Sequence, residues 1–318
     1  MIRRALLALL LSSAGPALAE DFQLGFPLDC TLGQDCYIQQ YMDRDPGPEA
    51  SDYRCFGLTY DSHKGTDFAL PSTAAMRAGV TVRAAADGVV KGTRDGMTDG
   101  APLAEVSGRE CGNGLVLDHG GGWESQYCHM KLGSVQVIQG QRVATGDALG
   151  QVGQSGQAEF PHLHLSLRHN GEPIDPFDPA DTATCDAAPK TSLWQDTPPY
   201  RPGGLISVGF SEGIPAYSDI KGGTANRQTL PATAPALVVY GYSYGTRKGD
   251  ILRLSLQGPR GEVIAQDVVM DRPQAQAFRA VGKKRRARLW RTGEYEGTVT
   301  LLRDGAVIDT RRGSLTVR

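Results

Sequence analysis

Apolar and polar residues alternate in several short runs of this chain, and one of these runs is residues 161–167, with the sequence PHLHLSL. Alternation with a period of two predicts a strand that buries one face. Side chains two positions apart on a strand point to the same side of the sheet. We therefore expect His162 and His164 to lie beside each other on one face of this strand.

Similar runs occur nearer the C-terminal end, at residues 252–256 (LRLSL) and 298–302 (TVTLL). Asp304 and Gly305 form a two-residue turn signal, which predicts a hairpin into residues 306–308. Turn signals separate these runs, a pattern typical of a small immunoglobulin-like β-sandwich. The 40 glycines among 318 residues argue against a mainly helical protein, so we predict a mainly β fold.

The chain is long enough for two domains of ordinary size. Residues 187–204 contain four prolines and little apolar periodicity, which predicts a Pro-rich linker. We therefore expect a first domain at residues 20–186, the linker at 187–204, and a β-sandwich accessory domain at 205–318.

The first residues have the three parts of a secretory signal peptide. A charged start, MIRR, precedes an apolar run at residues 5–11, and a small-residue cleavage site follows at 17–19. The run is too short to span a bilayer, and no later run approaches the roughly 20 apolar residues that a spanning helix needs. We predict a signal peptide at residues 1–19 and an exported chain without a stable membrane anchor; an uncleaved N-terminal anchor is the alternative.

The chain has six cysteines, and none stands in a C-x-x-C pair. In an exported protein we expect them to form disulfides rather than to bind metal, because an oxidising compartment preserves the bridges. Fifteen pairings are possible for six cysteines. Proximity in the sequence favours Cys30 with Cys36 and Cys111 with Cys128, which leaves Cys55 with Cys185.

Four of the six histidines fall in three short motifs. His63 and Asp67 belong to the first, His129 to the second, and His162 with His164 to the third. Imidazoles and a carboxylate are ligands of hydrolytic zinc, which takes three protein ligands and keeps one open position. A single histidine is more often a surface or core residue, and spacing alone does not decide which of His162 and His164 binds metal.

The motifs HKGTD, YCHM and HLH resemble, in this order, the H-x-x-x-D, Y-x-H and H-x-H motifs of the lysostaphin-like (LytM-type) zinc endopeptidases of peptidoglycan. The resemblance covers a motif core at residues 57–179. Two positions depart from the family pattern. Phe160 and Pro161 stand where a small residue and glycine are usual, and Ser166 stands where an acidic residue is common.

The resemblance implies that residues 20–186 form an antiparallel β catalytic domain, with one Zn²⁺ per chain bound by His63, Asp67 and His164. It implies that His129 and His162 are the catalytic imidazoles, and no H-E-x-x-H motif supplies a carboxylate base. The implied substrate is the cross-linking peptide of bacterial peptidoglycan, cleaved in cell-wall remodelling, with a Gram-negative periplasm as the compartment. Family members cleave glycyl bridges or D-alanyl to diaminopimelyl links; no residue of the sequence distinguishes them, and the compartment favours the latter.

Two other functions are compatible with the same motifs. One is a LytM-type regulator that activates a separate cell-wall amidase, and the other is a non-catalytic cell-wall-binding module. Such regulators often lack metal ligands, whereas all five positions are filled here, which favours the enzyme.

Charge is distributed unevenly, although the whole chain has a net charge of only -2. Residues 20–199 contain 12 basic and 25 acidic residues, a net charge of -13, while residues 200–318 contain 19 and 10, a net charge of +9. The most basic run is residues 283–291 (KKRRARLWR). Export argues against nucleic acid as the partner. We expect this run to dock onto the acidic half, with capture of an anionic envelope polymer or a merely solvated face as alternatives; the oligomeric state stays open.

Overall fold

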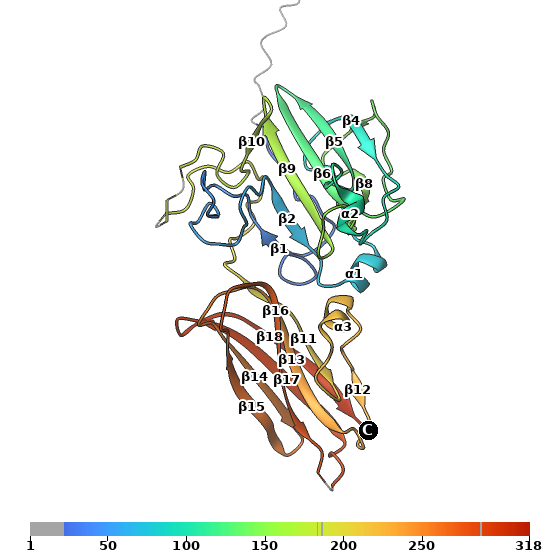
Figure 1. Cartoon of the computed structure of the whole chain (residues 1–318), viewed down its shortest axis with the longest axis vertical. Coiled ribbons are helices and arrows are strands. Elements are labelled where there is room, and N and C mark those ends of the chain that lie inside the picture. The colour runs from blue at the N-terminus through green and yellow to red at the C-terminus, as the bar shows by residue number, and fades with distance from the viewer. Residues whose placement is uncertain (1–21, 183, 186, 287) are drawn as a thin grey trace, which may run out of the picture.

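The computed structural model describes residues 22–182, 184–185, 187–286 and 288–318, and the predicted signal peptide at 1–19 lies outside them. Strands form most of the regular structure, which confirms the prediction of a mainly β fold. Figure 1 shows β1–β10 together at one end of the molecule and β11–β18 at the other. We call residues 22–203 the first half and residues 204–318 the second half. The exact domain and linker bounds stay a prediction.

One antiparallel sheet organises the first half. Its strand order is β1-β2-β9-β6-β5-β4-β7. β10 pairs with the C-terminal part of β9, beyond the residues that pair with β2. β3 and β8 form a separate two-stranded pair. The helices α1 and α2 are short. The elements are β1 (Tyr37–Gln40), β2 (Thr66–Ala69), α1 (Thr73–Ala78), β3 (Thr81–Arg83), β4 (Gly88–Arg94), α2 (Leu103–Val106), β5 (Asn113–Gly120), β6 (Trp123–Met130), β7 (Arg142–Val143), β8 (Ala148–Gln151), β9 (His162–His169) and β10 (Glu172–Ile174).

The predicted strand at residues 161–167 is β9, which lies inside the sheet between β2 and β6. Its three leucines at 163, 165 and 167 are buried in the core of the first half. The alternating positions 162, 164 and 166 therefore lie on the other face of the sheet. This alternation places both histidines of the HLH motif on one face, as predicted.

Two sheets pack face to face in the second half. One has the order β11-β13-β16 and the other β12-β18-β17-β14-β15, and both contribute leucines and valines to one apolar core. The predicted runs at 252–256 and 298–302 lie in β14 and β17. Whether this sandwich is immunoglobulin-like stays a prediction. The elements are β11 (Gly204–Ser211), α3 (Tyr217–Gly222), β12 (Thr229–Leu230), β13 (Ala236–Thr246), β14 (Ile251–Gly258), β15 (Gly261–Val269), β16 (Gln274–Lys284), β17 (Gly293–Arg303) and β18 (Ala306–Val317).

The hairpin predicted at Asp304 and Gly305 joins β17 to β18. Both turn residues have positive φ, 50° for Asp304 and 81° for Gly305. A two-residue turn with positive φ at both positions matches the twist of the flanking strands, which is why Asp-Gly is favoured there. The hairpin prediction is confirmed.

The two halves meet through polar and aromatic contacts at one end of β16. Gln276 donates from Nε2 to Tyr37 Oη and to Gln39 Oε1, both at 3.0 Å. The rings of Tyr37 and Tyr244 lie 4.5 Å apart. These contacts fix the second half against β1, the edge strand of the first sheet.

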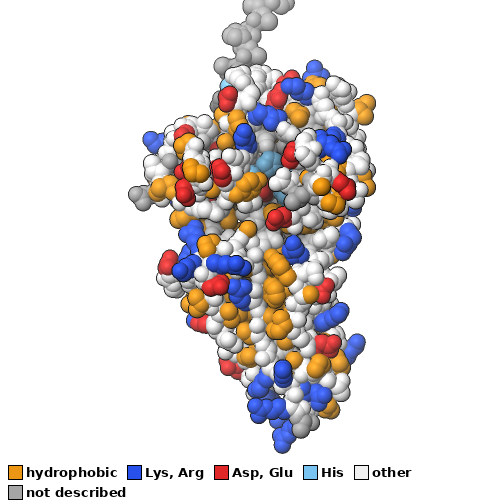
Figure 2. Space-filling model, viewed as in Figure 1, with side chains coloured by type: hydrophobic (Ala, Val, Ile, Leu, Met, Phe, Trp, Pro, Cys, Tyr) orange, Lys and Arg blue, Asp and Glu red, His pale blue; other side chains and the backbone are white. Residues whose placement is uncertain are grey.

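The prediction that residues 283–291 dock onto the first half is wrong. Within β16, residue 276 faces the first half, whereas Lys283 and Lys284 pair with the start of β13 at the opposite end of the strand. Eight residues of strand separate the two positions by about 26 Å. Figure 2 shows Lys and Arg side chains gathered at the end of the molecule farthest from the first half. Trp290 packs against its own sandwich, where its Nε1 donates to the Ala234 carbonyl.

Part of the segment predicted as a linker packs closely against the first half. Trp194 is buried, and its backbone forms a parallel bridge with Leu24. Tyr200 stacks near Tyr41, and its hydroxyl donates to Asp52 Oδ2 at 2.8 Å. Trp194 and Tyr200 therefore anchor this segment to the first half.

All three predicted disulfides are present. They join Cys30 to Cys36, Cys55 to Cys185, and Cys111 to Cys128. The third bridge holds β6 at the residue before His129, next to the candidate site.

Candidate metal and catalytic centre

Three strands bring the predicted ligands and imidazoles together. Asp67 on β2 pairs in register with His164 on β9, and Cys128 on β6 pairs with His164 from the other side. His63 precedes β2, and His129 is close to the end of β6. Residues more than 100 positions apart in the sequence therefore meet at the middle of one sheet face.

Three side-chain atoms converge at the centre of this cluster. His63 Nε2 lies 3.1 Å from Asp67 Oδ1 and 3.1 Å from His164 Nδ1, and His164 Nδ1 lies 2.8 Å from Asp67 Oδ1. Donors that bind one zinc ion tetrahedrally at 2.0–2.1 Å are separated by about 3.3 Å. The donor set and its spacing therefore fit a single zinc ion.

The hydrogen bonds around the cluster orient both imidazoles. His63 Nδ1–H donates to the Tyr41 carbonyl at 2.6 Å, which leaves a lone pair on Nε2. His164 Nε2 lies 2.9 Å from Ser166 Oγ, which can accept its hydrogen and leave a lone pair on Nδ1. Such outer hydrogen bonds set which ring nitrogen binds a metal. In this arrangement the lone pairs of His63 Nε2 and His164 Nδ1 and the carboxylate of Asp67 face one point, which favours the binding of a cation there.

Charge on the cluster follows from its burial and its contacts. Burial alone would raise the pKa of Asp67, but the surrounding imidazoles of His63, His162 and His164 hold that pKa well below its usual value. Burial likewise opposes protonation of His63, yet attraction to Asp67 and its hydrogen bonds raise the pKa of His63 overall. The carboxylate therefore stays ionised although it is buried.

The other two imidazoles lie beside this cluster. The rings of His129 and His162 have their centroids 4.5 Å apart, and His162 Nε2 lies 3.7 Å from Asp67 Oδ1. Both rings donate through Nδ1–H to backbone carbonyls, His129 to Ser155 at 2.8 Å and His162 to Phe160 at 2.9 Å. Each Nε2 is thus left free to accept a proton.

Burial keeps these two rings neutral. It lowers the pKa of His129 well below the usual value, with a further contribution from His162 and His164 nearby. Burial also lowers the pKa of His162, although Asp67 opposes that change. His129 has a positive φ of 62°, a conformation that is uncommon outside glycine and often found at functional sites. Neutral imidazoles with a free Nε2 are suited to act as bases near pH 7.

Sequence reasoning singled out these five residues, which the structure brings together, but it missed several of their partners. Tyr41 and Ser155 bind the imidazoles through backbone carbonyls, which leave no trace in residue identity. Tyr60, whose ring lies 4.5 Å from that of His63, could have been noticed because it is an aromatic residue three positions before the motif. Phe160, noted as a departure from the family pattern, packs its ring 4.6 Å from His162.

Histidine side chains are visible from solvent on one face of the first half (Figure 2). His164 is the half-buried member of the cluster, whereas His63, Asp67, His129 and His162 are buried. A buried, hydrogen-bonded carboxylate and imidazoles on one sheet face, reached from solvent, are compatible with a hydrolytic zinc site.

Residues 61–176 match the model of peptidase family M23, and this segment of the chain is an M23 domain of the LytM type. The matched residues include all five candidate site residues. The resemblance inferred from the three motifs is therefore confirmed.

Two curated relatives are similar to part of this chain. The chain is 35% identical over 120 residues to the DD-carboxypeptidase/endopeptidase Mpg of Neisseria meningitidis, which is 37% of this chain and 23% of that protein. It is 33% identical over 133 residues to the peptidoglycan DD-endopeptidase ShyA of Vibrio cholerae, which is 42% of this chain and 26% of that protein. The chain thus spans about a quarter of the length of these relatives. Among solved structures, a zinc containing peptidase from Vibrio cholerae aligns with a TM-score of 0.34 and 25% identity, over 48% of this chain and 39% of that chain.

Proposed function

We propose that this protein is a zinc-dependent endopeptidase that hydrolyses the cross-linking peptides of bacterial peptidoglycan. The observation that carries the proposal is the convergence of His63, Asp67 and His164 beside two neutral imidazoles, within a domain of peptidase family M23. Two relatives named for peptidoglycan or DD-peptide cleavage support the choice of substrate.

In this proposal one zinc ion per chain would be held by His63, Asp67 and His164. A zinc ion bound there supplies Lewis acidity toward the scissile carbonyl and toward the attacking water. Three protein donors would leave one position of such an ion for water or substrate, as hydrolytic zinc sites do.

His129 and His162 move the protons. One free Nε2 takes a proton from the attacking water, and the resulting imidazolium can donate it to the leaving amine. The second imidazole, after it takes a proton from solvent at Nε2, donates that hydrogen to the carbonyl oxygen and stabilises the negative charge that develops there. The backbone carbonyls of Ser155 and Phe160 hold both rings so that each Nε2 faces the reaction.

The proposed compartment is outside the cytoplasm, and a Gram-negative periplasm is favoured. The three disulfides support export, because such bridges persist in oxidising compartments. In the part of the chain that the structure describes, no helix is long and apolar enough to cross a membrane.

Metal analysis tests the ligand set directly. The purified wild-type protein should contain about one zinc ion per chain, and His164→Ala much less, because one of three donors is lost. His169→Ala, on the same strand but outside the cluster, is the matched control and should retain the metal. Equal zinc in His164→Ala and wild type would contradict the assignment.

Digestion of purified peptidoglycan tests the reaction. We expect the wild-type protein to release peptide products that carry a new amino terminus, with His164→Ala inactive. Release of glycan-free stems without a cut in the cross-link would instead indicate an amidase. An inactive protein that stimulates a separate amidase would support the regulator.

A further inference from the structure

A cluster of cations lies where the chain passes from β16 to β17. Residues 283–286 and 288–291 contain six Lys or Arg and no acidic residue, and we call these residues the basic tip. Figure 1 shows this connection at the end of the molecule opposite to the first half, and Figure 2 shows Lys and Arg side chains gathered there. The basic tip therefore faces solvent rather than the first half.

The fold does not neutralise the charge of the basic tip. Among the described residues, no carboxylate lies within ion-pair distance of any of its six cations. Arg285 donates from Nε to the carbonyls of Thr233 and Ala234, at 3.1 Å and 3.2 Å, which holds the side chain in place and leaves its charge intact. Six like charges repel one another, so an external anion would stabilise this end of the sandwich.

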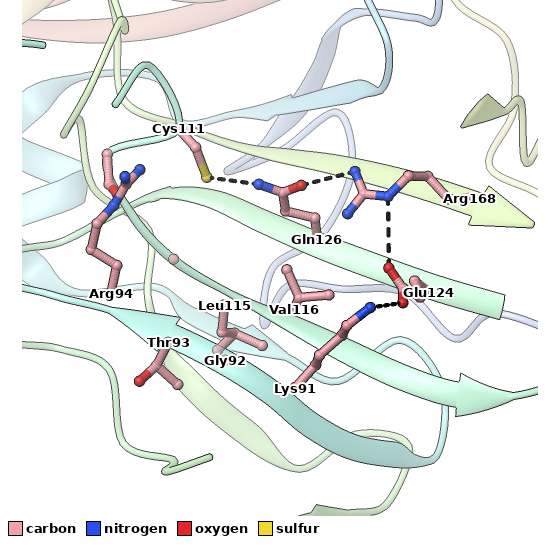
Figure 3. A pocket seen from close by; sticks show the side chains of 12 residues that line it. Lys91, Gly92, Thr93, Arg94, Cys111, Leu115, Val116, Glu124, Gln126 and Arg168 are labelled. Atoms are coloured by element: carbon pink, nitrogen blue, oxygen red, sulfur yellow. Dashed lines mark hydrogen bonds and ion pairs between the residues drawn. The ribbon is translucent and has the colours of Figure 1, made fainter. Parts of the chain in front are cut away.

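Cations in the first half show the difference. In a groove on its sheet, Lys91 is paired with Glu124, and Arg168 donates from Nη1 to Gln126 Oε1 at 2.9 Å (Figure 3). Glu124 also lies 3.9 Å from Arg168 Nε. The cations of the groove thus have partners within the fold, whereas the cations of the basic tip are left for a partner outside it.

An apolar side chain protrudes among the cations of the basic tip. Leu289 is 61% exposed, next to Arg288 in the sequence. Trp290 holds the segment to the sandwich, because its ring packs against the core and its Nε1 donates to the Ala234 carbonyl at 2.8 Å. An anionic polymer in water offers no apolar phase to Leu289. A lipid bilayer offers phosphates to the cations and acyl chains to the leucine, so the combination favours lipid.

We propose that the basic tip binds the surface of a membrane that contains anionic phospholipids. The inference goes beyond the proposed peptidase function and rests on the proposed export, which brings the chain to the membranes of the envelope. Cations at an anionic surface attract it over about a Debye length and are screened by salt. The association is therefore reversible and differs from a membrane-spanning anchor.

The place of the basic tip determines how the bound protein would be oriented. β16 extends over 11 residues, from Gln274 beside the first half to Lys284 at the tip. A strand of this length spans about 33 Å. A molecule standing on its tip would hold the candidate site beyond that distance from the lipid surface. The contact would therefore tether the protein without covering the site.

Vesicle flotation of the full exported chain tests the proposal. One set of vesicles contains phosphatidylglycerol and phosphatidylcholine in equal parts, and the other contains phosphatidylcholine alone. We expect binding to the anionic vesicles to be at least about tenfold stronger and to weaken as salt is added. Equal binding to both sets, or no binding to the anionic vesicles at low salt, would overturn the proposal.

Two charge variants locate the contact. Each cation close to an anionic membrane strengthens binding about fivefold, so the double variant Lys284→Gln with Arg288→Gln should bind about twentyfold more weakly. Lys248→Gln with Arg272→Gln is the matched control, because it removes one Lys and one Arg from exposed turns at the other end of the sandwich. The control should bind like wild type. Equal weakening of the two doubles would show that total charge, rather than the basic tip, causes binding.

Leu289→Ser separates a lipid partner from an anionic polymer. The variant keeps every cation and loses the apolar side chain, so its binding to anionic vesicles should fall about fivefold. Purified peptidoglycan sacculi supply the polymer. If the double variant Lys284→Gln with Arg288→Gln loses binding to sacculi and keeps binding to vesicles, the basic tip binds a polymer and the lipid proposal is wrong. These measurements need no hydrolysis, so their outcome is independent of the peptidase proposal.

Discussion

Each half of the molecule contains a buried carboxylate surrounded by side-chain nitrogen atoms. The nitrogens of the two sites differ in their charge and in whether they donate or accept hydrogen bonds. In the second half, Asp250 lies 2.9 Å and 2.7 Å from two guanidinium nitrogens of Arg303. Arg303 also donates to the carbonyls of Pro202 and Gly245. In the first half, Asp67 lies among imidazoles whose other nitrogens are held by Tyr41 and Ser166.

The comparison separates a structural ion pair from a binding site. Arginine brings a permanent charge and only donors, so its pairing with Asp250 is complete without any ligand. An imidazole whose far nitrogen already donates brings a lone pair instead, so Asp67 and its neighbours gain from a cation. Both carboxylates are equally inaccessible, and the chemistry of their partners makes the difference.

The largest expected effect comes from breaking the pair in the second half. Arg303→Leu leaves Asp250 buried without its cation and should lower the free energy of unfolding by about 3–5 kcal/mol. Urea denaturation measures the change. The double variant with Asp250→Leu should recover much of the loss, and Asp67→Asn in zinc-free protein should cost less than Arg303→Leu. A double variant no more stable than the single one would contradict this account.

Asp175 sharpens the comparison, because it is a buried carboxylate that lacks either kind of partner. Its Oδ1 accepts the Phe177 amide, while Oδ2 has no hydrogen-bond partner among the described residues. Burial raises its pKa to about 7, with Arg44 opposing the shift and Asp178 and Asp52 adding to it.

Between about pH 4 and pH 7, Asp175 is therefore protonated in the folded state but ionised in the unfolded state. Proton binding by Asp175 makes its full contribution to the free energy of unfolding below about pH 4. This contribution is lost as the pH rises through about 7, by at most about 1.4 kcal/mol per pH unit. Asp175→Asn should be more stable than wild type at pH 8 and lose this advantage at pH 4. Thermal melts of both proteins at the two pH values measure the difference, and parallel pH dependence would refute the raised pKa.

His129→Ala tests the division between binding and proton transfer within the first half. Because His129 lies outside the three converging donors, the variant should keep its zinc. Turnover should nevertheless fall by about a hundredfold or more, since the group that we propose to move a proton is lost. Metal content and hydrolysis are measured on the same preparation, and unchanged hydrolysis would remove His129 from the mechanism.

The smallest effect is expected at Ser166, which acts only through His164. Ser166→Ala should weaken zinc binding about tenfold by removing the partner of Nε2. Ser166→Asp, which restores the acidic residue common in the family, should strengthen it. Competition with a zinc chelator gives both affinities, and an alanine variant with wild-type affinity would show that Ser166 does not position the ring.

The five candidate site residues could be picked out of the sequence because they fall in three short motifs whose order matches a family pattern. The face shared by His162 and His164 followed from strand alternation alone. The hydrogen bonds that fix each tautomer were not predictable, because Tyr41, Ser155 and Phe160 contribute backbone carbonyls that every residue possesses.

The sequence predicted some features of the fold correctly and others wrongly. Asp304 and Gly305 signalled their hairpin because few other residues tolerate positive φ at both turn positions. The meeting surface of the two halves was predicted wrongly from net charge, since long-range attraction between exposed groups is weak and screened. The contact depends instead on Gln276 and a few tyrosines, whose pairing no composition count reveals.

The bridge between Cys55 and Cys185 has a consequence for the order of events during biogenesis. Its two ends lie 130 residues apart and enclose the whole M23 segment. Closing so long a loop removes many conformations from the unfolded chain, an entropic gain of roughly 5 kcal/mol. In the export proposed above, this gain is available only after Cys185 has followed the entire segment across the membrane, so we expect the sheet of the first half to hold together first and then to be locked by this bridge.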